Sequence, residues 1–195
     1  MKIAVIDNYD SFTYNLVHML EDIIDREVVV YRNDQLELKD LEDFDLLVLS
    51  PGPGIPEEAG KLKEIISFYA GKIPMYGVCL GLQAITEVFG GQIRNLDTVF
   101  HGVATTMTQT DQAGFYFEGI NKDFEAARYH SWVADLEGFP EDLLITAVDS
   151  TGEVMAIRHK TFPILAVQFH PESILTPSGY KQLENLVRHY ERDTQ

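Results

Sequence analysis

The chain has 195 residues, 45% of them hydrophobic, and a formal net charge of −16 from 15 Lys and Arg against 31 Asp and Glu. This length and apolar content predict one domain, residues 1–195, with a substantial core. The acidic excess disfavours binding to nucleic acid or to anionic membranes, which is driven by Lys and Arg. Two interpretations of the charge stay open, namely solubility alone or an acidic face that docks on a basic surface of a partner protein.

Cysteine content and apolar runs indicate the cellular compartment. A single cysteine excludes an intrachain disulfide and is typical of a reducing environment. The apolar run at 3–6 is too short for a secretory signal, and no apolar stretch approaches the ~20 residues of a membrane span. We therefore expect a cytoplasmic protein.

Strand-like and helical patterns alternate in the first half of the chain. Strands are predicted at 3–6, 28–31, 46–49 and 73–78, and helices at 13–24, 61–69 and 80–89. This alternation predicts a parallel sheet covered on both faces.

The second half differs, because its strand-like runs follow one another closely. They are predicted at 103–108, 124–129, 143–148, 154–159 and 164–169, before a last helix at 178–190. The predicted fold class is therefore α/β, an open, mostly parallel mixed sheet flanked by helices, with antiparallel strands in the second half.

Cys79 lies between a predicted strand and a predicted helix, in Gly77-Val78-Cys79-Leu80-Gly81. Glycines on both sides permit the tight turn of a nucleophile elbow, which exposes the side chain. The start of the helix directs free N–H groups and the positive end of its dipole at the sulfur, which favours the thiolate. Lone cysteines are commonly inert and buried, but this position favours a nucleophile.

A cysteine nucleophile needs a base and a group that orients the base. His170 directly follows an apolar strand, and Glu172 lies two residues further, on the same side of an extended backbone. Pro171 between them biases His170 towards that extended geometry. We interpret the two side chains as a base and its orienting carboxylate, the alternative being a surface pair at the end of a strand.

Backbone N–H groups for an oxyanion have two candidate sources. One is Leu80, directly after the nucleophile, and the other is the loop Ser50-Pro51-Gly52-Pro53-Gly54 at the end of a parallel strand, although such a sequence is also common in ordinary turns. The adjoining segment 54–62 does not match a phosphate-binding loop, because its glycine spacing is one residue too long and Leu62 replaces Ser or Thr. Scattered histidines and the lack of a C-x-x-C pair disfavour a metal site.

Six segments together resemble the class I (triad-type) glutamine amidotransferases, most closely the amidotransferase subunits (component II) of anthranilate synthase and aminodeoxychorismate synthase. The segments are 7–15, 31–34, 50–54, 77–81, 128–131 and 168–173, so the resemblance covers nearly the whole chain. It implies hydrolysis of glutamine, with Cys79 as the nucleophile, His170 as the acid and base, and Glu172 as the orienting group. It further implies an oxyanion hole from the N–H groups of Gly52 and Leu80, and glutamine contacts at Gly52, Pro53, Gly54, Gln83, Ser131 and Trp132.

Two positions depart from the family pattern. Leu82 stands where relatives commonly have His, and Trp132 stands where they commonly have Leu. Since that histidine is outside the triad, we expect catalysis to survive the first change. The second is mild if residue 132 meets substrate through its backbone, and it alters the pocket if the side chain forms a wall.

The resemblance also implies a partner, because it indicates no second active site for chorismate in this chain. We expect a separate chorismate-using synthase subunit that receives ammonia through the interface, and the segment 7–15 lies either near that interface or simply caps a helix. Anthranilate synthase of tryptophan biosynthesis is the favoured partner, and aminodeoxychorismate synthase of folate biosynthesis, or both, is the alternative. No cofactor is expected in this chain, and any magnesium would belong to the partner.

Two functions of other classes remain as alternatives at this point. One is a stand-alone cysteine hydrolase that acts on γ-glutamyl bonds. The other is a non-catalytic subunit that only docks.

Overall fold

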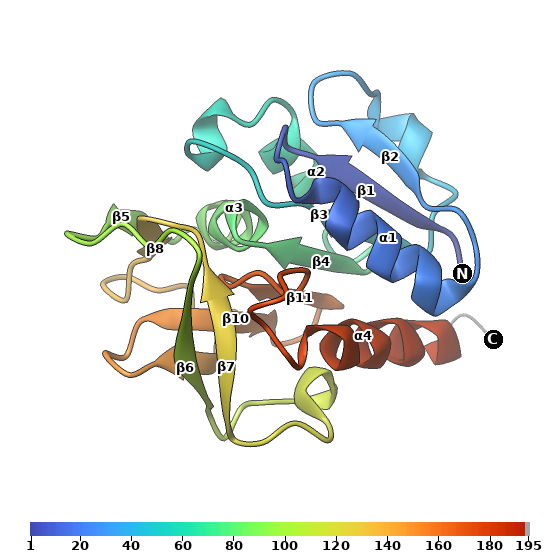
Figure 1. Cartoon of the computed structure of the whole chain (residues 1–195). Helices are drawn as coiled ribbons and strands as arrows, with labels where there is room; N and C mark the ends of the chain where they lie inside the picture. The colour runs from blue at the N-terminus through green and yellow to red at the C-terminus, as the bar shows by residue number, and fades with distance from the viewer. Residues whose placement is uncertain (194–195) are drawn as a thin grey trace.

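A mixed sheet of nine strands forms the centre of the computed structural model, which describes residues 1–193 (Figure 1). Five neighbouring strands are parallel: β2 (Val29–Arg32), β1 (Ile3–Asp7), β3 (Leu46–Leu49), β4 (Met75–Val78) and β11 (Ile164–Val167). The sheet continues in antiparallel order through β10 (Val154–His159), β9 (Leu143–Asp149), β6 (Val103–Gln109) and β7 (Asp123–Arg128). The predicted α/β class, with its antiparallel second half, is confirmed.

Helices cover both faces of the parallel part. Helices α1 (Thr13–Ile24) and α4 (Gly179–Asp193) pack side by side on one face, while α2 (Leu62–Tyr69) and α3 (Leu80–Val88) cover the other (Figure 1). Alternate residues of β1 enter the two cores, Ile3 and Val5 on the α1 side and Ala4 and Ile6 on the α2 side. A strand buried on both faces needs apolar residues at every position, which is why these strands are continuous apolar runs.

Strand β11 joins the two halves of the sheet. It runs parallel to β4 and antiparallel to β10, so the last strand of the chain occupies a central place in the sheet. The sequence grouped the run at 164–169 with the antiparallel strands, and its parallel partner β4 lies more than 80 residues earlier.

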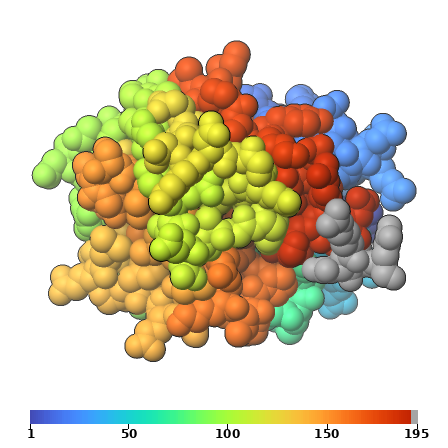
Figure 2. Space-filling model, turned by 90° about the horizontal axis from the view of Figure 1, so that it is seen from below, coloured from blue at the N-terminus to red at the C-terminus, as the bar shows by residue number. Residues whose placement is uncertain are grey.

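Several short elements were not predicted. Strands β5 (Ile93–Asn95) and β8 (Trp132–Ala134) form a separate antiparallel pair, and three short 3-10 helices occur at η1 (Leu38–Leu41), η2 (Pro56–Glu58) and η3 (Phe115–Phe117). Figure 2 shows η3 and the β6–β7 hairpin beside α4 on one face of the molecule. Within residues 1–193, no helix combines the length and apolar character that a bilayer crossing requires.

Chain direction brings five loops to one edge of the sheet. The strands β1, β3, β4 and β11 point the same way, and β7 points that way too, because four antiparallel pairings separate it from β11. The segments that follow these five strands therefore meet beyond the same edge, where open α/β sheets place ligands.

Candidate active site

The backbone at Cys79 is strained. Cys79 lies directly between β4 and α3 with φ 53° and ψ −98°, a conformation that non-glycine residues rarely adopt. Its N–H donates to the carbonyl of Val167 at 2.7 Å, and its own carbonyl accepts the first bond of α3 from Gln83 at 3.2 Å. The turn is therefore fixed from both sides, by β11 and by the helix.

The flanking glycines serve close packing, because neither has a positive φ. A Cβ on Gly77 would lie 2.7 Å from the backbone carbon of Gly81, and one on Gly81 would lie 2.7 Å from the carbonyl oxygen of Leu49. The sequence attributed these glycines to the turn itself. The structure instead places the left-handed residue at Cys79 and uses the glycines to press α3 against β3 and β4.

His170 and Glu172 form a buried pair beside the elbow. His170 Nδ1 is 2.6 Å from Glu172 Oε1, and both side chains are at most 2% exposed. Burial alone would lower the pKa of His170, but the Glu172 carboxylate and the Cys79 sulfur outweigh it and raise this pKa well above its ordinary value. Since Nδ1 is engaged by Glu172, Nε2 is the nitrogen left for the sulfur to act on, and it makes no aligned hydrogen bond with any described residue.

Two aromatic rings hold the imidazole in place. The ring of Tyr129 lies 4.9 Å from that of His170 in an edge-on arrangement, and Phe12 contacts both rings, at 4.9 Å and 5.8 Å. Neither ring was predicted to contact the site, although both belong to segments that carry the family resemblance. The contact of Phe12 assigns part of the segment 7–15 to packing against the triad.

The loop after β3 is tied to the loop after β1. Asn8 donates its backbone N–H to Ser50 Oγ at 2.9 Å and its side-chain amide to the Ser50 carbonyl at 2.8 Å. A Cβ on Gly52 would lie 2.6 Å from Asn8 Cβ and 2.6 Å from Leu80 Cδ2. Only glycine therefore lets this loop approach the elbow so closely.

A cavity of about 210 Å³ opens above the Cys79 sulfur. All six predicted glutamine contacts line it together with Cys79, namely Gly52, Pro53, Gly54, Gln83, Ser131 and Trp132. Tyr129 and His130 line it as well and were not predicted to do so. The proposed oxyanion donor Leu80 is the first residue of α3, so its amide lies at the helix start with no intrahelical acceptor.

The structure also locates the two departures from the family pattern. The Leu82 side chain is fully buried in the core on the α2 side, and the residue does not line the cavity. Trp132 directs its carbonyl oxygen inward, where Gln83 and His130 contact it at 2.9 Å and 3.0 Å. These inward contacts use a backbone group, so they do not depend on the indole at position 132.

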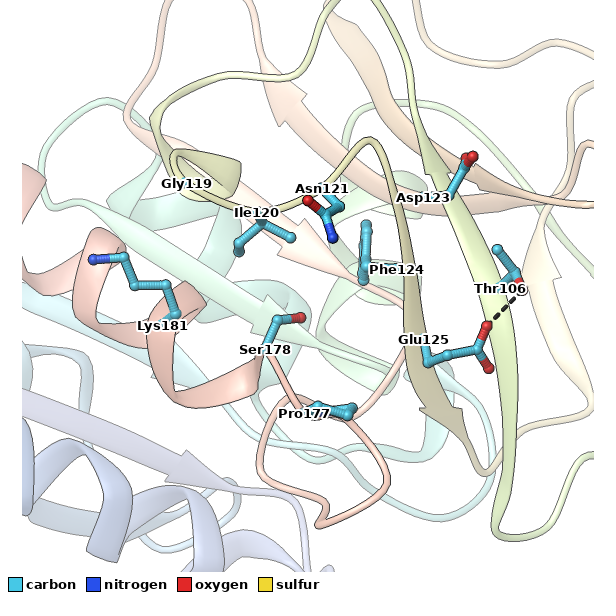
Figure 3. A pocket seen from close by; sticks show the side chains of 10 residues that line it. All are labelled: Thr106, Gly119, Ile120, Asn121, Asp123, Phe124, Glu125, Pro177, Ser178 and Lys181. Carbon is cyan, nitrogen blue, oxygen red and sulfur yellow. Dashed lines mark hydrogen bonds between the residues drawn. The ribbon is translucent and has the colours of Figure 1, made fainter.

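A larger cavity, of about 480 Å³, lies between β7 and the start of α4 and contains neither Cys79 nor His170 (Figure 3). Its charged side chains are engaged by neighbours, Glu125 by Thr106 at 2.5 Å and Lys181 by Glu184 at 2.7 Å. It holds no nucleophile next to a base. In residues 1–193, no three His, Cys, Asp or Glu side chains group in a way that could hold a metal ion.

Comparisons with known proteins agree with this geometry. The family model for class I glutamine amidotransferases matches residues 4–190. The aminodeoxychorismate/anthranilate synthase component 2 of Bacillus subtilis is 44% identical over 193 residues, which cover 98% of each chain. The anthranilate synthase component 2 of Pseudomonas aeruginosa is 43% identical over 95% of this chain and 94% of its own. Among solved structures, a putative GMP synthase subunit from Thermoplasma acidophilum superposes with a TM-score of 0.86 at 25% identity, over 100% of this chain and 97% of the other.

Proposed function

Because this chain belongs to the class I glutamine amidotransferase family, we propose that it is a glutaminase subunit that serves a chorismate-using synthase. It hydrolyses L-glutamine to glutamate and delivers the ammonia to that partner. The observation that carries the proposal is the position of Cys79, at a strained elbow next to the His170–Glu172 pair, in a cavity lined by every predicted glutamine contact.

The reaction proceeds through a glutamyl thioester. The Cys79 thiolate attacks the side-chain amide carbon of glutamine, and the N–H groups of Leu80 and Gly52 hold the resulting oxyanion. The C–N bond then breaks as His170, kept protonated by its raised pKa, gives its proton to the departing nitrogen, which leaves as ammonia. His170 next removes a proton from water, which attacks the thioester, releases glutamate and frees the sulfur.

Glu172 keeps the imidazole in one orientation throughout. Its carboxylate holds Nδ1, so that Nε2 remains directed at the sulfur and the leaving nitrogen. This assignment uses no cofactor in this chain, and any magnesium belongs to the synthase partner.

The synthase partner is anthranilate synthase of tryptophan biosynthesis. Two relatives that match nearly full length are named as component 2 of that enzyme, and the Bacillus subtilis name also includes aminodeoxychorismate synthase. That double name supports a second candidate, an aminodeoxychorismate partner in folate biosynthesis or a subunit shared by both. The net charge of −16 fits docking on a basic partner surface, and the single cysteine fits a cytoplasmic location.

Product formation from chorismate tests the proposal. Each candidate synthase subunit is mixed with wild type or Cys79→Ser, with either glutamine or an ammonium salt as the nitrogen source. We expect glutamine-dependent product with wild type alone, and ammonium-dependent product with both. Anthranilate or aminodeoxychorismate as the product identifies the partner.

The same mixtures separate the alternatives when glutamine hydrolysis is also measured, with and without a synthase subunit. Glutamine hydrolysis that is already maximal without any partner favours a stand-alone γ-glutamyl hydrolase. Glutamine-dependent product that survives Cys79→Ser leaves a docking role only. We expect low activity in the isolated chain, because partner docking completes the oxyanion hole.

A further inference from the structure

A buried ion pair lies behind the glutamine cavity, outside the triad. Arg128 on β7 donates from Nη1 to Asp149 on β9 at 2.7 Å, and the two side chains are 3% and 4% exposed. Arginine has only donors, so the contact of its Nε with His130 Nε2 at 3.1 Å requires that nitrogen to be an acceptor. The proton of His130 must therefore sit on Nδ1. Burial and the Arg128 charge lower the pKa of His130 to about 3, which keeps the ring neutral.

His130 holds the backbone carbonyl that orients two buried amides. His130 Nδ1 donates to the Trp132 carbonyl at 3.0 Å, and that oxygen accepts a second bond from Gln83 at 2.9 Å. A carbonyl only accepts, so the atom that Gln83 directs to it must be its nitrogen. The same nitrogen has a second hydrogen, which lies on the side of Gln168, whose oxygen is 3.2 Å from that nitrogen.

Gln168, the last residue in this chain of hydrogen bonds, contacts the proposed nucleophile Cys79. Because Gln168 directs its oxygen at Gln83, its nitrogen faces the Cys79 sulfur, at 3.4 Å. Gln168 is fully buried and Gln83 is 3% exposed, so bulk water does not compete for these groups. Each donor and acceptor from Arg128 to the sulfur is thus determined by its neighbour.

We propose that Gln168 is a catalytic residue that directs an N–H group at the Cys79 sulfur, and that Asp149, Arg128, His130 and Gln83 are positioning residues that fix its orientation. An N–H group at this place stabilises the thiolate, which is the nucleophilic form of cysteine. A flipped amide would present its oxygen and repel it. Two of the positioning residues, Gln83 and His130, line the glutamine cavity, so they also connect the sulfur to the cavity wall.

This role rests on the proposed glutaminase function, but its test does not use glutamine. Cys79 is the sole cysteine, so alkylation by iodoacetamide reports on its sulfur alone. We expect Gln168→Leu to slow alkylation at pH 7 about tenfold, the loss expected for one hydrogen bond to a charged group. Gln168→Glu, which faces the sulfur with a carboxylate oxygen, slows it further.

The matched control is Gln182→Leu. Gln182 is also a fully buried glutamine with hydrogen bonds, to Tyr116 and Ser178, and it has no contact with the sulfur. We expect its alkylation rate to equal that of wild type. Circular dichroism and thermal melts of every variant identify any rate change that comes from unfolding.

A second pair of variants tests the positioning residues at a distance. His130→Asn keeps an N–H group near the Nδ1 position, whereas His130→Leu removes it. We expect His130→Leu to alkylate about threefold more slowly than His130→Asn and to have the higher KM for glutamine with the synthase partner. Equal rates for folded Gln168→Leu and wild type overturn the proposal. Absence of glutamine-dependent product in wild type overturns the proposed function instead and leaves the alkylation result intact.

Discussion

The strained backbone at Cys79 predicts an inverted response to glycine. In an ordinary helix or strand, replacing Ala by Gly destabilises a protein by about 0.5–1 kcal/mol, because glycine loses more conformational freedom on folding. At position 79, with φ 53° and ψ −98°, every residue with a Cβ is strained, and only glycine relieves the strain. We therefore compare Cys79→Ala with Cys79→Gly, both of which lack the nucleophile.

The magnitude follows from two opposing contributions. A sparsely populated backbone conformation costs on the order of 1–3 kcal/mol, and glycine avoids this cost. Glycine also loses more conformational entropy on folding, which offsets about 0.5–1 kcal/mol of the stability gained. Cys79→Gly should therefore be at least as stable as Cys79→Ala, by roughly 0–2 kcal/mol. The control is Ala84→Gly, in the buried middle of α3, which should destabilise by about 1 kcal/mol or more.

Urea unfolding and thermal melts of the isolated chain measure both comparisons. For a domain of this size, about 1 kcal/mol corresponds to roughly 2–4 °C in Tm. If glycine costs as much at position 79 as at position 84, the elbow stores no strain and the reasoning fails. If glycine costs less at position 79 than at position 84, the native backbone at Cys79 is strained, and stability is lost there in order to place the sulfur.

Three further predictions concern the site. Glu172→Gln should lower the pKa of His170 and therefore shift the alkaline limb of the glutamine-hydrolysis pH profile to lower pH. Activity should also fall by about 10²-fold or more. An alkaline limb that does not move contradicts the role of the carboxylate. The pKa of His130 is about 3 in the folded protein, so as the pH falls below 6.5 the unfolded state binds the proton first. The free energy of unfolding should therefore fall by up to about 1.4 kcal/mol for each pH unit. His130→Asn should flatten that slope when urea unfolding is measured at several pH values. In Gly52→Ala the new Cβ would lie within 2.9 Å of three atoms, so we expect kcat/KM to fall about hundredfold, while Gly114→Ala, which meets nothing within 4 Å, should match wild type.

The sequence was most informative where local chemistry is special. The continuous apolar runs predicted β1, β3 and β4, because strands buried on both faces allow no polar residue. The elbow at Cys79 and the spacing of His170 and Glu172 predicted three side chains that the structure brings together. Such predictions depend on residues close in the chain, where spacing determines geometry.

The remaining features depend on pairings between distant residues. Strands β5 and β8 have three residues each and no clear periodicity, so only their mutual pairing reveals them. Arg128 and Asp149 meet across β6, although they lie 21 residues apart in the sequence. No local pattern indicates such a contact, although it holds the Arg128 side chain that contacts His130.

The central place of β11 has a consequence for biosynthesis. During translation β4 is complete at Val78 and can pair with β3, but its second neighbour, β11, is complete only at Val167. The edge of β4 that faces β11 therefore stays unpaired while 89 more residues are made. At typical elongation rates this takes roughly 4–18 s, during which an exposed edge is open to aggregation. The same late strand supplies the carbonyl that holds Cys79 and leads directly into His170. The nascent chain therefore completes its sheet and the proposed catalytic pair in one late event, and a ribosome-bound fragment that ends before β11 contains the proposed nucleophile without its base.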